Sequence, residues 1–179
     1  QFPTGLVDFN LIIQNLDTLK TAAQTQGGIY LGESGKYGYH LKFMSSGTVD
    51  IYKVTVLQPR IWGYNGEQWV HESNDIKTET FYQNYTLPSN CAPIFIEDNI
   101  WVEGNIKGRT TVVAAKLPEM PASLKKIIIP NNINYADANS VLGLISQKDI
   151  LISFYSPNNL KIQAALLAQK GHVFRYYYS

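Results

Sequence analysis

The sequence contains one cysteine, three histidines and no long uninterrupted run of apolar residues. A single cysteine, Cys91, excludes an intramolecular disulfide and any metal site built from several cysteines. We expect its thiol to be buried or half-buried. His40, His71 and His172 are separated from one another and from Cys91, so no metal-ligand spacing and no nucleophile–base pair is visible. We therefore expect no metal and no cofactor.

Two further features are missing. No stretch of about 18 apolar residues exists, so no segment is predicted to span a membrane. No glycine-rich phosphate loop is present, because residues 104–108 lie inside a strand pattern and open no helix. Gln1 does not begin a signal peptide. We interpret the chain as an excised ectodomain that contacts a membrane only through a segment absent from this chain.

Hydrophobic residues make up 45% of the 179 residues, which excludes a disordered chain. In residues 94–115 the apolar positions alternate with a period of two and are interrupted by Asp98, Asn99, Gly104 and Gly108. These breaks come too often for a helix, and Asn and Gly favour turns. The segment is predicted to form several short strands joined by tight corners.

Two internal repeats extend this prediction. Residues 94–102 align with residues 127–135 at an offset of 33, and residues 144–150 align with residues 166–173 at an offset of 22. An offset near 22 is typical of one coil of a β-solenoid with three short faces.

The larger offset is explained by residues 116–123, whose two prolines break the strand pattern and predict a loop insertion. We therefore predict that the chain is mainly β and that residues 94–179 form a parallel β-solenoid of about three to four coils. An ordinary antiparallel sandwich is the alternative.

The N-terminal half begins with a helical pattern. Asp8 occupies an N-cap position, and Gly27 and Gly28 end the helix. Between them, apolar residues recur at helical spacing: Phe9, Ile12, Ile13, Leu16, Leu19 and Ala23. We expect this amphipathic helix to cover the open end of the solenoid or a sheet, because unpaired strand edges need such a cover.

Alternating strand patterns follow the helix at residues 29–31, 39–43 and 49–56, and residues 77–82 are predicted to form one more strand that points outward. No long linker separates the halves. Residues 1–93 are therefore expected to pack on residues 94–179 as one structural unit.

The charge is divided unevenly along the chain. Residues 1–99 carry about −4 and residues 100–179 about +5, although the formal net charge is +1. Clustered positive charge attracts anionic polymers. With Tyr176–Tyr178 as stacking platforms, eight basic residues are candidates for binding DNA or another polymer: Lys107, Arg109, Lys116, Lys125, Lys126, Lys161, Lys170 and Arg175. Prevention of edge-to-edge aggregation is the alternative role for these residues.

An enzymatic alternative is a polysaccharide-cleaving enzyme on a parallel β-helix, in which side chains of successive coils form rows. The carboxylates available for acid–base chemistry are Glu97, Asp98, Glu103, Asp137 and Asp149. The basic residues that would accompany them are Lys107, Arg109, Lys148 and Lys170. This hypothesis requires Asp98, Glu103 or Asp149 to approach one another in a cleft.

Four segments carry a resemblance to a known family: NIWVEG at 99–104, GRTT at 108–111, VLGLISQ at 141–147 and AALLAQ at 164–169. Residues 2–27 and 38–50 fit the same pattern. The chain resembles the PilX-like pilus assembly proteins of bacteria, which are minor type IV pilins whose ectodomains carry a β-solenoid. The resemblance covers nearly the whole chain but departs at the hydrophobic anchoring helix, which this sequence lacks.

The resemblance implies a non-enzymatic function and offers no catalytic residues. It implies an extracellular ectodomain at the cell surface, in a pilus, with other pilins as partners. Such a protein presents a rigid face for adhesion or for DNA capture during DNA uptake.

Overall fold

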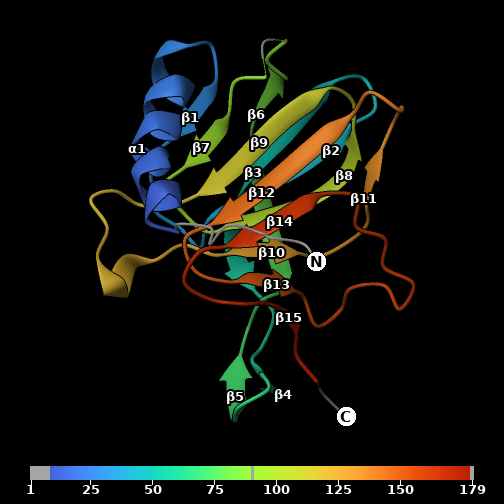
Figure 1. The fold of residues 1–179 in the computed structure, drawn as a ribbon. Helices are drawn as coiled ribbons and strands as arrows, with labels where there is room; N and C mark the ends of the chain where they lie inside the picture. Colours follow the sequence, from blue (N-terminus) through green and yellow to red (C-terminus); the bar gives the residue numbers. More distant parts are fainter. Residues whose placement is uncertain (1–8, 90, 178–179) are drawn as a thin grey trace, which may run out of the picture.

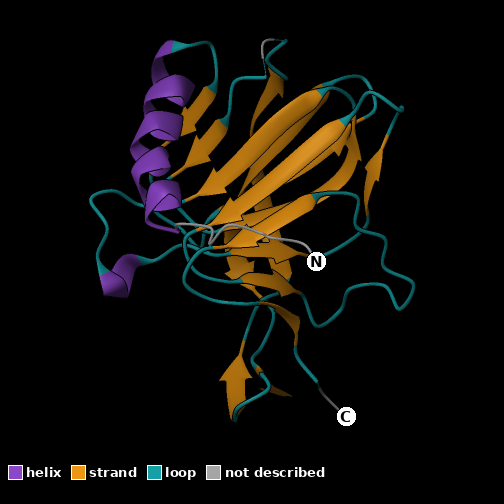
Figure 2. Cartoon of the chain, in the orientation of Figure 1, coloured by secondary structure: helices purple, strands orange, loops and turns teal. Residues whose placement is uncertain are grey.

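The computed structural model describes residues 9–89 and 91–177, which are mainly β (Figures 1 and 2). Within these residues the α-helix α1 spans Phe9–Thr25, and the short 3-10 helix η1 spans Pro121–Ser123. The predicted N-cap Asp8 lies outside the described residues, as does Tyr178 of the predicted stacking platform.

A five-stranded sheet forms one side of the molecule. In spatial order its strands are β1 (Ile29–Leu31), β7 (Ile94–Ile96), β9 (Arg109–Ala114), β12 (Val141–Ser146) and β14 (Ala165–Ala168). All neighbours are parallel, so that one row of paired positions runs across the sheet through Ile29, Ile94, Val112, Leu144 and Leu166.

A larger, eight-stranded sheet forms the other side. Its main path is β15 (Val173–Arg175), β13 (Ile150–Ile152), β10 (Ile127–Ile129), β8 (Ile100–Ile106), β2 (Tyr39–Met44), β3 (Thr48–Leu57) and β6 (Ile76–Thr86), while β11 (Ile133–Tyr135) pairs with the second half of β8. The strands from β15 to β2 are parallel, and β3 and β6 continue the sheet antiparallel. A second row therefore passes through Tyr39, Ile100, Ile127, Ile150 and Val173.

From β7 onward the chain passes from one sheet to the other at every corner except the one between β10 and β11, and the main hydrophobic core lies between the two sheets. Every second residue of a strand points inward. The inward residues include Ile94 and Val112 of the five-stranded sheet and Leu41, Val102 and Ile129 of the large sheet, and all five are fully buried. The alternation read from the sequence is thus the alternation between this core and the outer faces.

The outer face of each sheet is also partly covered. Leu16 and Ala23 of α1 pack on Phe95 and Val113 of the five-stranded sheet, so the helix covers a sheet face (Figure 2). The outer face of the large sheet buries Trp101 and other apolar residues beneath the connection that follows β3. This connection contains the antiparallel hairpin of β4 (Ile61–Tyr64) and β5 (Trp69–Glu72), which projects from the molecule (Figure 1).

The strand register confirms one of the two predicted repeats and contradicts the other. The offset of 22 is confirmed, since Leu144 pairs with Leu166 and Ser146 with Ala168. The offset of 33 is wrong: Ile127 pairs with Ile100 in the large sheet, whereas Ile94 pairs with Val112 in the five-stranded sheet. The two apolar runs match in composition, but they belong to different sheets.

The direction of the strands also tests the antiparallel alternative. Every strand pair within the described residues from 94 to 177 is parallel, so the antiparallel sandwich is wrong for this region. Residues 115–126 contain no strand, as predicted for the insertion. The pairs β1–β7 and β2–β8 join residues before 94 directly to the later strands.

Candidate functional site

Three of the eight predicted polymer-binding residues are engaged by carboxylates. The Nζ atoms of Lys116 and Lys125 lie 2.8 Å and 3.3 Å from Oε1 of Glu33, and Lys170 pairs with Glu119. Each pair places a negative charge beside the positive one. The potential that these lysines offer to an anionic polymer is therefore reduced.

Two more of the eight are not on an open surface. Lys126 is partly buried and its Nζ donates a hydrogen bond to Oδ1 of Asn74 at 2.8 Å. Burial lowers the pKa of Lys126. Arg175, at the end of β15, is half-buried.

The last three, Lys107, Arg109 and Lys161, are exposed. Lys107 and Arg109 lie at the beginning of β9, whereas Lys116 follows its end, and the six residues of β9 span about 20 Å. The structure therefore brings Lys107 and Arg109 together, and Lys116 and Lys125 together, at opposite ends of the five-stranded sheet.

Lys107 and Arg109 border a shallow cavity of about 420 Å³, together with Cys91 and Asp137. Hydrogen bonding to the Ser140 hydroxyl lowers the pKa of Asp137. Cys91 is exposed, so the prediction of a buried or half-buried thiol is wrong. The connection from β6 to β7 turns at Cys91, whose φ is 60°, and leaves its side chain at the surface.

The carboxylates of the enzymatic alternative have separate partners. The first two act at the corner that follows β7: Glu97 accepts hydrogen bonds from Lys20 and Tyr30, and Asp98 accepts from Ser34. The others bond elsewhere: Glu103 faces His40, Asp137 accepts from Ser140, and Asp149 accepts from the backbone of His172. The hypothesis requires Asp98, Glu103 and Asp149 to converge in one cleft. Instead, each of these three carboxylates contacts a different residue.

A cluster of charged side chains on the outer face of the large sheet was not predicted. His40 is only 4% exposed, and its Nδ1 lies 2.6 Å from Oε2 of Glu79. Its Nε2 lies 3.3 Å from Oε1 of Glu103, an ion-pair contact too poorly aligned for a well-formed hydrogen bond. Lys42 Nζ lies 2.6 Å from the other oxygen of Glu79. We call these four residues the His40 cluster.

The local structure explains how the His40 cluster assembles. His40 and Lys42 are two residues apart on β2 and therefore point to the same face. Lys42 pairs in register with Glu103 of β8, while Glu79 comes from β6 on the far side of β3. The cross-strand charge pair of Lys42 and Glu103 is the signal that could have revealed part of this cluster.

Burial and charge act against each other in the His40 cluster. Burial of His40 opposes its protonation, but the Glu103 and Glu79 carboxylates outweigh this effect and raise the pKa of His40. Burial likewise opposes ionisation of Glu79, but His40 and Lys42 outweigh it and lower the pKa of Glu79 to about 2. The contact with His40 lowers the pKa of Glu103. The cluster therefore binds a proton in a buried, charge-compensated setting.

The His40 cluster lines a cleft of about 430 Å³ that also contains Asp75, Lys77 and Tyr155. Asp75 accepts hydrogen bonds from the backbone of Phe154 and Tyr155 and thereby fixes one wall. Among the described residues that line the cleft, none is a serine, threonine or cysteine. The arrangement offers charged and hydrogen-bonding side chains to a polar ligand.

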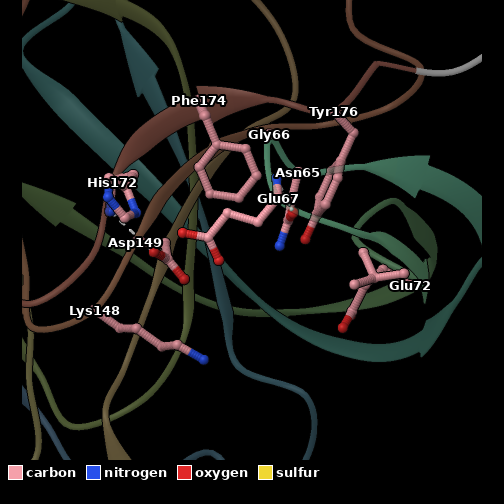
Figure 3. A pocket seen from close by; sticks show the side chains of 10 residues that line it. Asn65, Gly66, Glu67, Glu72, Lys148, Asp149, His172, Phe174 and Tyr176 are labelled. Atoms are coloured by element: carbon pink, nitrogen blue, oxygen red, sulfur yellow. Dashed lines mark hydrogen bonds between the residues drawn. The ribbon is translucent and has the colours of Figure 1, made fainter.

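A second cavity, of about 440 Å³, lies between the β4–β5 hairpin and β15. Figure 3 shows the rings of Phe174 and Tyr176 and the carboxylates of Glu67 and Asp149 around it. His172, which the sequence left without a partner, lines this cavity, and its backbone N–H donates to Asp149. We call it the hairpin cavity.

The described residues contain neither a metal site nor a membrane-spanning helix. No group of three or more His, Cys, Asp or Glu side chains in residues 9–89 and 91–177 is arranged to hold a metal ion. In the same part of the chain, no helix is long and apolar enough to cross a membrane.

No protein-family model, no curated protein and no solved structure matches the chain. The resemblance to PilX-like pilins therefore stays a prediction.

Proposed function

We propose that the chain is a non-enzymatic, surface-exposed ectodomain of a minor type IV pilin or pilus-tip protein, and that its parallel ladders form a β-solenoid with a rigid face for adhesion. The observation that carries this proposal is the pair of in-register rows, one through Ile29, Ile94 and Val112 and the other through Tyr39 and Ile100. Parallel rows of this kind hold outward side chains at intervals of about 4.8 Å, which suits an extended ligand.

The position of α1 supports the pilin part of the proposal. Through Leu16 and Ala23, α1 packs along the outer face of the five-stranded sheet. A helix in this position can connect the β-rich part of the chain to an assembly. The proposal places the protein outside the cell, with other pilins as partners.

Intact pili provide the direct test. The purified chain is incubated with sheared pili of the bacterium that encodes it, and the pili are sedimented. We expect the chain to sediment with the pili and to stay in solution without them. Recovery that is the same with pili from a strain lacking all minor pilins, whose pili offer no minor-pilin partner, would contradict incorporation beside other minor pilins.

Adhesion is favoured over DNA capture, because only four of the eight predicted basic residues are exposed and one of these, Lys170, pairs with Glu119. If Lys107, Arg109 and Lys161 each contact one phosphate, affinity falls about 40-fold between about 50 and about 200 mM salt. Fluorescence anisotropy with a labelled duplex measures this. The double variant Lys107→Glu, Arg109→Glu should abolish binding, whereas Lys36→Glu, Lys77→Glu, with the same charge change elsewhere, should retain most of it. Binding that is indifferent to salt and to both pairs of substitutions would remove DNA capture.

A further inference from the structure

The hairpin cavity has the form of a ligand site that the proposed function does not use. Its volume of about 440 Å³ falls within the range of about 300–1,000 Å³ found for small-molecule sites. It combines two aromatic rings with several polar side chains, and its residues come from distant parts of the chain: the hairpin, the β12–β13 corner and β15.

The aromatic walls of the cavity are held in place. The rings of Phe174 and Tyr176 meet edge to face with centroids 5.0 Å apart, and Tyr176 also stacks on Phe154 at 4.9 Å. A side chain at Gly63 would come within 2.7 Å of Phe154, so glycine allows the hairpin to approach these rings. Burial, followed by the charges of Glu72 and Asp149, raises the pKa of Tyr176 to about 12, which keeps its hydroxyl protonated as a donor.

The polar groups of the cavity are partly fixed and partly available. Asn65 Oδ1 accepts hydrogen bonds from the backbone N–H groups of Glu67 and Gln68, both at 2.9 Å, which fixes the tip of the hairpin. One oxygen of Asp149 accepts from the backbone of His172 at 3.0 Å. The carboxylates of Glu67 and Glu72 make no hydrogen bond or ion pair with any side chain in residues 9–89 and 91–177.

Charge restricts the class of ligand. Three carboxylates, Glu67, Glu72 and Asp149, line the cavity and repel an anion. Lys148 lines it as well, and its positive charge offsets part of theirs. Hydrogen-bond donors and acceptors together suit a neutral ligand that carries many hydroxyl groups.

We propose that the hairpin cavity binds a pyranose ring of a neutral saccharide. The ring of Phe174, supported by the buried ring of Tyr176, contacts the apolar C–H face of the sugar. The carboxylates of Glu67 and Glu72 accept hydrogen bonds from its hydroxyl groups, and Lys148 donates one. This inference deepens the proposed adhesive function and rests on it, because it names the chemical class to which the protein adheres.

The hairpin supplies a matched control. Trp62 pairs in register with His71, stacks on its ring at 4.9 Å and is 61% exposed. Glu72 and Val70, which line the cavity, alternate with His71 and Trp69 along β5 and therefore point to the opposite face. Trp62→Ala thus removes an exposed aromatic ring from the same hairpin without altering the cavity.

Isothermal titration calorimetry with cellohexaose, maltohexaose and N-acetylchitohexaose tests the proposal. We expect the wild-type chain to bind at least one of them with a dissociation constant below about 1 mM. Glu67→Ala, Glu72→Ala should weaken that binding at least tenfold, and Trp62→Ala should leave it unchanged. Thermal unfolding of each variant checks that the chain is folded.

Three results would overturn the inference: no binding of any neutral hexasaccharide, binding of cationic chitosan hexamer alone, or loss of binding in Trp62→Ala with retention in the double variant. The last result would assign binding to the exposed face of the hairpin. The pilus sedimentation experiment is independent of these titrations. A chain that sediments with pili but binds no neutral saccharide keeps the proposed function and loses this inference.

Discussion

Replacing Glu79 by Gln is the most informative perturbation of the His40 cluster. The carboxylate of Glu79 contacts both His40 and Lys42 at 2.6 Å, and the side chain is only 18% exposed. Hydrogen bonds to charged groups contribute about 1.5–3 kcal/mol, and removing one member of a buried ion pair costs about 3–5 kcal/mol. Because Glu79 is not fully buried and Glu103 still faces His40, we expect Glu79→Gln to lower the free energy of unfolding by about 2–3 kcal/mol near pH 5.5.

The pH dependence of this loss follows from the pKa shifts. The folded pKa of Glu79 is lowered from 4.5 to about 2, so its charge stabilises the fold above pH 4.5 and stops doing so as the pH falls toward 2. The folded pKa of His40 is raised above 6.5, so its charge stabilises the fold below pH 6.5 and stops doing so as the pH rises through the folded value. The destabilisation by Glu79→Gln should therefore be largest between about pH 5 and 6.5 and smaller on either side.

Urea unfolding at about pH 3, 5.5 and 9 measures these differences. Glu67→Gln is the matched control, because Glu67 is exposed and should change the free energy of unfolding by less than about 0.5 kcal/mol. Two results would contradict this explanation: a loss of unfolding free energy in Glu79→Gln no larger than in the control, or a loss that is the same at all three values of pH. Either would show that the Glu79 carboxylate does not stabilise the fold through protonated His40.

Three further substitutions test the packing that positions these sites, each by urea unfolding. Trp101→Ala removes a ring that is 2% exposed and that donates from Nε1 to the carbonyl of Asn74 at 2.8 Å. It should lower the free energy of unfolding by about 3–5 kcal/mol, and a loss below about 1 kcal/mol would contradict the burial of the ring. Gly38→Ala places a Cβ against the Asn99 carbonyl at a φ of 141°, whereas a Cβ at Gly32 meets open space. Gly38→Ala should lower the free energy of unfolding by more than about 1 kcal/mol and Gly32→Ala by less. Equal effects would refute this explanation. Asp98→Ala removes the acceptor of hydrogen bonds from the Ser34 N–H at 2.8 Å and the Ser34 hydroxyl at 2.6 Å. It should lower the free energy of unfolding by about 1–3 kcal/mol. A neutral effect would show that this corner does not depend on those bonds.

The amino-acid sequence alone determined the β class, the alternation of the strands and one correct register. Leu144 and Leu166 were aligned correctly because the corner after each strand is short and similar, with Gln147-Lys148 matching Gln169-Lys170, so that the same spacing returns the chain to the same sheet. The outward strand at residues 77–82 was also predicted, and it lies within β6, where most side chains are exposed. These features depend on local patterns that burial imposes on every second residue.

Only the tertiary structure decided which apolar run joins which sheet. Ile94 and Ile127 begin runs of the same composition, and no local signal states that β7 pairs with β9 while β10 pairs with β8. The same holds for the sites. His40 and Glu79 are 39 residues apart, and their side chains meet because β3 lies between β2 and β6 in the large sheet. A period of two tells which residues share a face of one strand, but which strands lie side by side is decided by the packing of the whole chain.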